Sequence, residues 1–563
     1  MLRSLPPSRA VGILLVASSV WLAVPGFRLV AQQAAGYNVS GTILDAITRQ
    51  PVARALVQVG SGDAVLTDNN GKFEFGNVQF AYERITVRRP GYISNQGSPG
   101  LQPSQDQLSI FDFQVGPDMP PLSFMLTPEA IVTGRIAMTD SDVADGTRVT
   151  AYRKTIETGR TEWQMAGVAT TNSDGIFRIA SLSPGNYLLY AQPEANLSYV
   201  VPDNSTSSGY APAYYPDVAE PAAAGIVTVS AGEHKAADFA LTRRTFYPVT
   251  FRVANGRPGY FNNFQIQDTG GADAGVPITS DPAQQIAHAH LPPGRYLLSV
   301  RALSLDNKGA PLVGRREFTV SASSGTYVSI SVVPLGSVPV TVRKEFTATS
   351  TSTVSHVGIG LDLYSRSPFN PGVNISLIDT GNQFSGGGSS AAGLERVPGS
   401  NDETSYQIRN VPPGKYWVQA DAVGSYISSI TSGGVDLTRD VLSVGDGGSS
   451  APIEITLRND SGSIDGKIDT ASLADREKHS TWICVIPLFP TASALSSVEA
   501  SSTGNFTFDS LAPGAYRVIA FDSRRQIEFH NPEAVAALSG AGQAVTVEPG
   551  ETAHIQLNVE HSP

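Results

Sequence analysis

A ten-residue segment recurs along the chain and divides it into units of similar length. Its copies are LSPGNYLLYA (182–191), LPPGRYLLSV (291–300), VPPGKYWVQA (411–420) and LAPGAYRVIA (511–520). We call each copy a Pro-Gly segment and its first residue the anchor. The anchors lie 109, 120 and 100 residues apart. These are whole-domain lengths, whereas solenoid repeats recur every 20–50 residues or so. A tandem array of domains is therefore predicted.

A degenerate fifth copy precedes these four. In FEFGNVQFAYERITV, Val78 takes the anchor position 104 residues before Leu182, but the Pro-Gly pair is missing. Five residues before the anchors stand Phe73, Phe177, Ile286, Tyr406 and Phe506, and three before them stand Phe75, Ile179, His288, Ile408 and Phe508. Residues two apart share one face of a strand, so both sets are predicted to point into a core.

Turn residues separate the predicted strands. Proline followed by glycine favours a type II turn within each Pro-Gly segment. Upstream, TDNNGKFEF and TNSDGIFRI place Gly71 and Gly175 behind Asn/Asp clusters, which predicts tight hairpins. Asp68 and Asp174 are the candidates for a calcium site there, but too few oxygen ligands lie nearby. We therefore interpret them as turn residues.

Each unit ends on a short apolar strand, and many short strands with frequent turns favour a β-sandwich. The closing strands are LSFMLT, AADFALT, YVSISVV, IEITLRN and HIQLNVE. The predicted fold is all-β, with five antiparallel sandwiches in tandem. Their predicted boundaries are 37–128, 129–245, 246–335, 336–459 and 460–563.

The first unit carries a family resemblance. VSGTILDAITRQPVARALVQV followed by TDNNGKFEFGNV resembles the carboxypeptidase regulatory-like domain. Later stretches, including EFHNPEAVAALSGAGQAVTVEPGETAHIQL, are similar to large exported proteins of soil bacteria that contain several such domains. The resemblance implies a transthyretin-like (prealbumin-like) sandwich and export. Because the wider fold group includes starch-binding-like modules, it also implies carbohydrate binding.

The start of the chain predicts export. Arg3 and Arg9 precede the apolar run VGILLVASSVWLAVPGF, and a cleavage point after Ala31 makes 1–31 a signal peptide. An uncleaved anchor is the alternative, although the run barely reaches the length of about 17 residues that a span needs. No second apolar segment follows, so the mature chain is expected to have no transmembrane segment and to be secreted, periplasmic or at the cell envelope.

Charge and motifs argue against several function classes. The net charge is −11, so nucleic acid is an unexpected partner. His530 and Glu533 form an isolated His-x-x-Glu, which we interpret as a helix start with Asn531 as N-cap and Pro532 at the first helical position. His288 and His290 lack a third ligand, and Cys484, the only cysteine, is expected to be a core thiol. We predict no catalytic residue, metal or cofactor.

Two places are candidates for ligand binding. SYVVPDNSTSSGYAPAYYPD puts Tyr199, Tyr210, Tyr214 and Tyr215 in one long loop. Exposed aromatic faces stack on sugars or pack against proteins, but a long loop also packs on its own tyrosines. Trp417 follows the inward Tyr416 and should face outward, toward either a ligand or a neighbouring unit.

The function predicted from the sequence is that of a non-catalytic exported binding protein. Polysaccharide is the first candidate ligand because of the family resemblance. The alternative is a cell-surface spacer, scaffold or adhesion protein whose partners are envelope proteins. An exposed row of aromatic rings would favour the first, and an exposed apolar patch or free sheet edge would favour the second.

Overall fold

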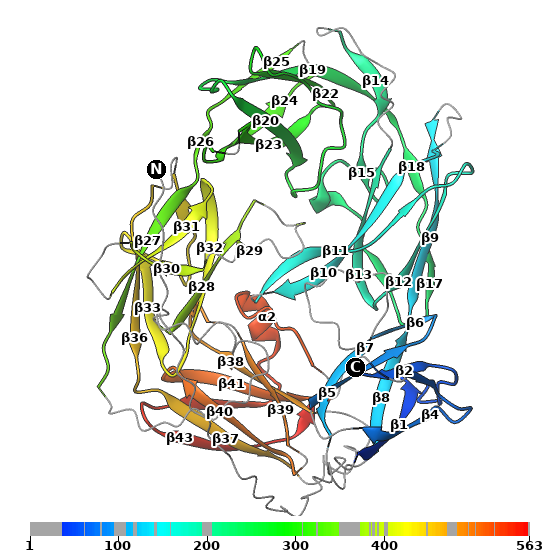
Figure 1. Ribbon diagram of the computed structural model, residues 1–563, viewed down its shortest axis with the longest axis vertical. Coiled ribbons are helices and arrows are strands. Elements are labelled where there is room, and N and C mark those ends of the chain that lie inside the picture. Colours follow the sequence, from blue (N-terminus) through cyan, green and yellow to red (C-terminus); the bar gives the residue numbers. More distant parts are fainter. Residues whose placement is uncertain are drawn as a thin grey trace, which may run out of the picture.

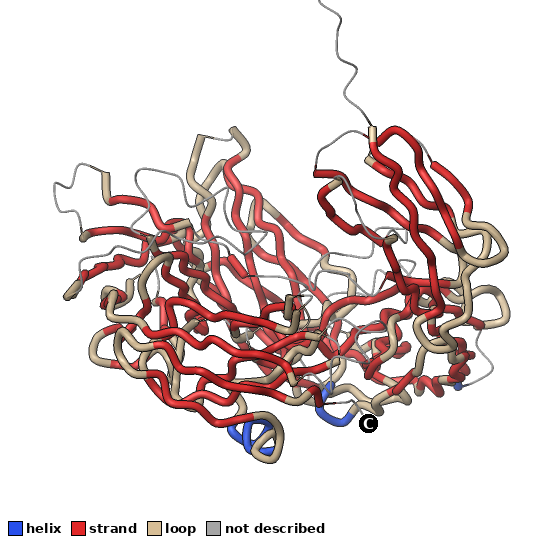
Figure 2. The backbone as a smooth tube through the Cα atoms, turned by 90° about the horizontal axis from the view of Figure 1, so that it is seen from below, coloured by secondary structure: helices blue, strands red, loops and turns tan. Residues whose placement is uncertain are grey.

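The computed structural model describes residues 36–560 with gaps, the longest of which are 95–108, 194–204, 348–371 and 470–480. The predicted signal peptide and Tyr199 lie outside the described residues. The described chain is almost entirely strand and loop (Figure 2), with α2 (Pro532–Ala537) as a short helix. Among the described residues, no helix has the length and apolar content to cross a membrane.

The described strands form sheets that pack in pairs, giving five sandwiches that we call the first to fifth modules. The first module pairs one sheet of β1 (Tyr37–Asp45), β4 (Lys72–Val78), β6 (Tyr92–Ser94) and β8 (Leu122–Pro128) with one of β2 (Leu56–Val59), β3 (Ala64–Leu66), β5 (Tyr82–Arg88) and β7 (Ser109–Gln114).

The second module has β9 (Ala130–Met138), β12 (Ile176–Leu182), β17 (His234–Ala236) and β18 (Phe239–Leu241) on one side. Its facing sheet contains β10 (Arg148–Glu157), β11 (Arg160–Thr170), β13 (Gly185–Gln192), β15 (Ala213–Tyr214) and β16 (Val227–Val229).

The third module places β14 (Ser207–Tyr210), β19 (Arg243–Val253), β21 (Thr279–Asp281), β22 (Ile286–Leu291) and β25 (Thr326–Ile330) in one sheet. The facing sheet runs in the order β20 (Tyr260–Asp268), β23 (Gly294–Ser304), β24 (Leu312–Val320) and β26 (Val333–Pro334).

The fourth module joins β27 (Gly336–Lys344), β30 (Leu394–Arg396), β31 (Ser405–Val411), β33 (Tyr426–Ser432), β34 (Val435–Asp436) and β36 (Ile453–Arg458). Opposite them lie β28 (Val373–Asp379), β29 (Ser389–Ser390), β32 (Gly414–Ala422) and β35 (Leu442–Val444).

The fifth module has β37 (Gly462–Ile468), β40 (Asn505–Leu511) and β43 (Thr552–Leu557) in one sheet. The other contains β38 (Trp482–Pro487), β39 (Ser496–Glu499), β41 (Gly514–Phe521), β42 (Gln543–Val547) and β44 (Val559–Glu560).

Each module has its own buried apolar core between its two sheets. The all-β tandem fold predicted from the repeats is confirmed. The sandwiches are mainly antiparallel, but each opening strand also pairs in parallel with a late strand of its module, as β1 does with β8 and β37 with β43. The module boundaries stay predictions, and the one at 245 falls inside β19, whose first residues pair with β14.

The modules follow one another around a ring, with the fifth returning toward the first (Figure 1). The β10–β11 hairpin projects from the second module into the middle of this ring. The chain is thus folded back on itself, an arrangement that the length of the repeats left undetermined.

The Pro-Gly segment connects the two sheets of a module. The strand before it and the strand after it belong to opposite sheets, and the glycine is the first residue of the second strand. Gly185 and Gly514 have φ of +154° and +155°, far from the value near +80° that a type II turn requires. The predicted type II turn is therefore wrong. The link bridges two packed sheets, so the backbone extends across the corner instead of reversing within one sheet.

The recurring tyrosine closes this corner. The hydroxyl groups of Tyr187, Tyr296, Tyr416 and Tyr516 donate hydrogen bonds to the carbonyl oxygens of Ser183, Pro292, Pro412 and Ala512, at distances of 2.5, 3.0, 2.7 and 2.7 Å. In each case the acceptor is the residue after the anchor. The ring lies in or against the module core, so one side chain both fills the core and holds the corner.

A β-bulge precedes the anchor in four modules and is missing from the third. The residue before the anchor has a left-handed backbone, with φ of 61° at Asn77, 61° at Ser181, 59° at Asn410 and 59° at Ser510. The strand pairing shifts register at or next to each of these residues. In the third module β22 pairs with β19 without a shift. A one-residue change of register turns every side chain upstream of it to the other face.

The missing bulge changes which residues of β22 are buried. Ala287 and Ala289 point into the core, while His288 and His290 are half-buried on the other face. The prediction that His288 occupies a core position is therefore wrong. Its Nδ1 lies 3.2 Å from the hydroxyl of Thr250, and His290 Nε2 lies 3.1 Å from the carbonyl oxygen of Ser205.

Small and large residues pair between the opening strand of a module and the strand that precedes its Pro-Gly segment. Gly134 pairs with Phe177, and a Cβ at Gly134 would overlap the Phe177 ring and the carbonyl of Ala237. In the third module the sizes are exchanged, because Phe251 lies opposite Ala287. Both modules thus combine one large and one small residue at this layer, as close packing requires.

Candidate functional site: the junctions between modules and the edge of the third sandwich

The tip of the β10–β11 hairpin reaches the fourth module. The guanidinium carbon of Arg160 lies 3.6 Å from the centroid of the Trp417 ring, a cation–π contact. Both side chains are half-buried, and burial lowers the pKa of Arg160 from its usual value. Trp417 therefore faces outward from its own sandwich, as predicted, and contacts another module.

The same tip is held against the fifth module. The backbone N–H of His530 donates to the carbonyl oxygen of Gly159 at 3.2 Å, and the N–H of Ile156 donates to Gln526 Oε1 at 3.3 Å. Gly159 has a φ of +75°, and a Cβ there would overlap the ring of Phe529. Only glycine meets both requirements at this close approach.

A buried aromatic cluster joins the second, third and fourth modules. The Tyr214 hydroxyl donates to Asp268 Oδ2 at 2.5 Å, and the Tyr190 hydroxyl donates to the carbonyl oxygen of Asp273 at 2.7 Å. Phe384 of the fourth module contacts Tyr214 and Tyr152, with ring centroids 5.8 and 4.6 Å away. Three modules thus share one small apolar core.

Asp268 supplies the carboxyl group at the centre of this cluster. Burial raises the pKa of its carboxyl group, and hydrogen bonds from Tyr214 and from the N–H groups of Gly270 and Ala272 act in the opposite direction. Burial also raises the pKa of Tyr190 and Tyr214 well above the usual value. The tyrosines therefore remain neutral donors to the third module.

Ion pairing and backbone pairing complete the contacts between successive modules. Arg315 of the third module is 2.5 Å from Asp379 of the fourth, and both side chains are about one-fifth exposed. The N–H of Ala420 donates to the carbonyl oxygen of Ala492 at 2.9 Å, which ties the fourth module to the fifth. The modules are thus connected by contacts as well as by the chain.

The predicted ligand-binding residues lie in different settings. Tyr214 is fully buried in the shared cluster, and half-buried Tyr215 contacts the Phe239 ring edge-on at 5.5 Å. Tyr210 is half-buried at the end of β14, with the Arg243 guanidinium 5.3 Å from its ring. Trp417 is covered by Arg160. The structure does not bring these four residues together as one exposed surface.

The residues considered for catalysis and metal binding have structural roles. Asn531 accepts a hydrogen bond from the N–H of Glu533 at 3.1 Å, and Pro532 is the first residue of α2, so the predicted helix start is confirmed. Cys484 has no exposed surface, and burial raises the pKa of its thiol to about 11, as expected for a core cysteine. Within the described ranges, no three His, Cys, Asp or Glu residues gather as a metal site.

The candidate calcium residues are turn residues. Asp68 Oδ1 accepts hydrogen bonds from the N–H groups of Asn70 and Lys72, both at 2.8 Å. Asn172 makes the same two contacts in the second module, and Gly71 and Gly175 have φ of 69° and 72°. Because β3 and β4 belong to different sheets, as do β11 and β12, these turns are not the predicted hairpins.

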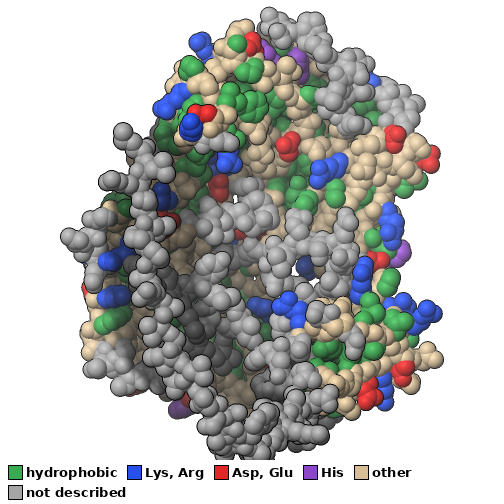
Figure 3. Space-filling model, viewed as in Figure 1, with side chains coloured by type: hydrophobic (Ala, Val, Ile, Leu, Met, Phe, Trp, Pro, Cys, Tyr) green, Lys and Arg blue, Asp and Glu red, His purple; other side chains and the backbone are tan. Residues whose placement is uncertain are grey.

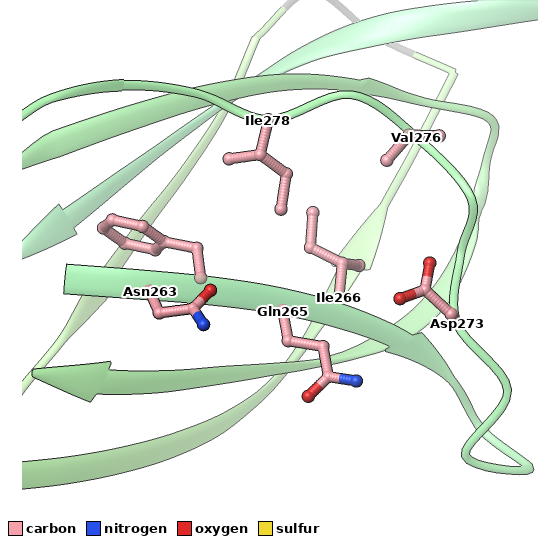
Figure 4. A pocket seen from close by; sticks show the side chains of 7 residues that line it. Asn263, Gln265, Ile266, Asp273, Val276 and Ile278 are labelled. Atoms are coloured by element: carbon pink, nitrogen blue, oxygen red, sulfur yellow. The ribbon is translucent and has the colours of Figure 1, made fainter.

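Sequence reasoning missed a groove at the edge of the third module. It has a volume of about 500 Å³ and lies between β20 and the segment that follows it. Phe264, Ile266, Val276 and Ile278 give it apolar walls, and Asn263, Gln265 and Asp273 lie at its margin (Figure 4). The available signal was the absence of charged residues from YFNNFQIQ at 260–267.

Comparisons with known proteins give alignments to solved structures at low sequence identity. No protein-family model and no curated protein matches the sequence. Solved structures that align with it include the Bacillus anthracis TIE protein, with 12% identity over 76% of this chain and 74% of that one and a TM-score of 0.14.

Two further alignments are to two B repeat units of the collagen binding protein (CNA) of Staphylococcus aureus and to BcpA, the major pilin subunit of Bacillus cereus. The first has 10% identity over 71% of this chain and 94% of that one, with a TM-score of 0.13. The second has 10% identity over 76% and 99%, with a TM-score of 0.12. At such TM-scores the whole chains do not superpose.

Proposed function

We propose that the mature chain is a non-catalytic exported scaffold that holds protein-binding surfaces in a fixed arrangement at the cell envelope or outside the cell. The observation that carries this proposal is the contact between modules that are not neighbours in sequence. The β10–β11 hairpin of the second module contacts Trp417 of the fourth and Phe529 of the fifth. A string of independent binding domains would not need such contacts.

The positions of the aromatic residues favour a protein-binding scaffold over a polysaccharide-binding protein. Stacking on sugar rings requires exposed aromatic faces. Tyr214 has no exposed surface, and one face of Trp417 is occupied by Arg160. Two of the aromatic residues that the sequence offered for a ligand, Tyr214 and Trp417, instead join modules. The predicted signal peptide at 1–31 supports export.

Two measurements test this proposal. Small-angle scattering of the mature protein should give a radius of gyration nearer to about 24 Å, the value for one compact body of this size, than to about 43 Å, the value for a thin rod of about 150 Å. Binding should then be measured to a panel of soluble and insoluble polysaccharides and to purified envelope proteins.

The binding measurement includes two matched variants. Trp417→Ala removes a candidate sugar-stacking ring, and Arg409→Ala changes an exposed residue of the same module that pairs with Glu395. A scaffold should bind a protein partner saturably and show no Trp417-dependent retention on glycans. Retention by a polysaccharide that Trp417→Ala abolishes and Arg409→Ala preserves would overturn the proposal.

A further inference from the structure

The free edge of β20 ends in a groove that has the chemistry of a strand-binding site. We propose that this edge of the third module binds an extended segment of a partner protein, which adds to the sheet as a further strand. This inference rests on the proposed scaffold function and assigns it a contact surface. The partner segment carries alternating apolar residues and a Lys or Arg next to Asp273.

The chain following β20 begins to pair with it and then departs. The N–H of Asp268 donates to the carbonyl oxygen of Ala272, and the N–H of Ala274 donates to that of Ile266, both at 2.9 Å. Beyond Ala274 the chain crosses to β21, which pairs with β22 in the facing sheet. The outer edge of β20 is thus paired at the C-terminal end of the strand. From Phe264 toward the N-terminus it has no neighbouring strand among the described residues.

The backbone N–H and C=O groups of Phe264 point away from β23, toward the open edge of the sheet. Peptide groups of a strand alternate in direction, so those of Phe264 and Ile266 point the same way, and the Ile266 carbonyl points away from β23 toward Ala274. Phe264 N–H and C=O have no hydrogen-bond partner within the described part of the chain. An extended polypeptide supplies donors and acceptors at the two-residue spacing that this edge repeats.

The groove accommodates one apolar side chain of such a strand. Val276 and Ile278 point from the departing segment toward Ile266 on β20 (Figure 4). Ile266 belongs to the module core, and Phe264, Val276 and Ile278 are partly buried against that core. Because side chains alternate across a strand, the next guest residue would face away from the groove.

The edge lacks the usual protection against strand addition. Natural edge strands carry charges, prolines or bulges that block pairing. Residues 260–267 of β20 contain neither a charged residue nor a proline. The outer face of the same sheet also exposes Phe261 and Leu303, which are 45% and 40% exposed and pair across β20 and β23. Apolar side chains gather over this part of the module (Figure 3).

Charge indicates the kind of partner. Asp273 is exposed at one end of the groove, where its Oδ1 accepts the Gly275 N–H at 2.7 Å. Its Oδ2 has no cationic partner among the described residues. The chain as a whole carries a net charge of −11. A basic residue at the matching end of the guest strand would therefore be favoured over an acidic one.

The test uses the full mature protein and two synthetic peptides, Lys-Val-Thr-Val-Thr-Val-Lys and its counterpart with Glu at both ends. We expect saturable binding of the basic peptide, measured by fluorescence anisotropy, and at least about tenfold weaker binding of the acidic peptide at low salt. Asp273→Asn keeps an acceptor for the Gly275 N–H, and it should weaken binding of the basic peptide about three- to tenfold.

Two variants probe the edge and the groove. Phe264→Pro removes the outward N–H, and Val276→Arg places a charge in the groove. Each should weaken binding at least about tenfold. Leu305→Arg, at a residue 74% exposed on the same module and outside the groove, is the control and should bind as wild type does. Calorimetry verifies that all variants remain folded.

The outcomes separate this inference from the proposed function. Peptide binding that survives both Phe264→Pro and Val276→Arg overturns the β20 site, as does capture of a protein partner unchanged in both variants. In those cases the scaffold function still stands. A concentration-dependent dimer that Phe264→Pro abolishes would show that the β20 edge binds a second copy of this chain. That result would overturn the proposal that it binds a segment of a different protein. Absence of any protein or peptide binding would overturn both proposals.

Discussion

The second and third modules contain nearly the same Pro-Gly segment but bury opposite faces of the strand before it. In the second module Phe177 and Ile179 are buried, five and three residues before the anchor Leu182. In the third module Ala287 and Ala289 are buried, four and two residues before Leu291. The left-handed residue Ser181 accounts for the difference, because His290 at the equivalent place has no positive φ. One backbone conformation therefore decides the orientation of a whole strand.

The largest expected effect comes from placing a charge on the two faces of β22. Ala289→Asp would bury a carboxylate without a partner, and we expect it to lower the free energy of unfolding of the third module by about 5 kcal/mol. His288→Asp, on the half-buried face, should cost less than about 1 kcal/mol. Calorimetry of the mature protein measures both, and the opposite order would mean that β22 faces the other way.

The exchanged large and small residues give the next effect. Phe177→Ala in the second module and Phe251→Ala in the third should each lower the free energy of unfolding by about 3 to 5 kcal/mol, because each leaves a cavity in a closed core. Ile176→Ala changes a residue that is 47% exposed, and should cost below about 1 kcal/mol. Denaturant titration of each variant measures the change in the free energy of unfolding. A small loss for Phe251→Ala would show that Phe251 contributes little to the core of the third module.

The bulge itself can be tested at an exposed residue. Ser510→Val places a β-branched side chain in a left-handed conformation and should cost about 1 to 2 kcal/mol. Ser510→Gly should be neutral or stabilising, whereas His290→Gly in the regular strand should destabilise by about 1 kcal/mol. Thermal unfolding gives the signs. Equal effects of glycine at both positions would contradict the difference between the modules.

The smallest effect concerns the corner that these modules share. Tyr416→Phe removes the hydrogen bond to the Pro412 carbonyl and should cost about 1 kcal/mol at neutral pH. Burial raises the pKa of Tyr416 from 10.0 to about 12, with Asp379 adding to the shift. The folded form therefore retains the phenol proton longer than the unfolded chain does.

This shift gives the pH dependence a definite sign. Stability from the Tyr416 proton is fully present below pH 10 and is lost as the pH rises toward about 12. Urea titrations between pH 8 and about 11 should show a shallower loss for Tyr416→Phe than for wild type. If the two proteins lose stability in parallel as the pH rises, Tyr416 does not contribute to the alkaline loss of stability.

Much of each module could be predicted from local patterns. The inward positions Phe177, Ile408 and Phe508 follow from two-residue alternation, and the helix start at Asn531 follows from capping chemistry. The bulge was also signalled, because Asn or Ser precedes four anchors and such residues tolerate positive φ better than most. Alternation alone could not reveal it, since a bulge interrupts the period that alternation assumes.

The fate of the candidate ligand residues depended on contacts far apart in sequence. Nothing near Trp417 predicts that Arg160 covers it, and nothing near Tyr214 predicts that Phe384 and Asp268 enclose it. The groove depends on where the chain leaves β20, which no residue pattern specifies.

The sequence by itself therefore determined the number of modules, their β-sandwich class and the positions of many of their turns. These features repeat, and they depend on local backbone preferences and on which side chains avoid water. Only the tertiary structure decided which face of β22 is buried, how the modules close into a ring, and which aromatic residues and strand edges remain available. The face of β22 depends on how its backbone pairs with β19 inside the module. The other outcomes depend on the packing of surfaces that meet only after each module has folded.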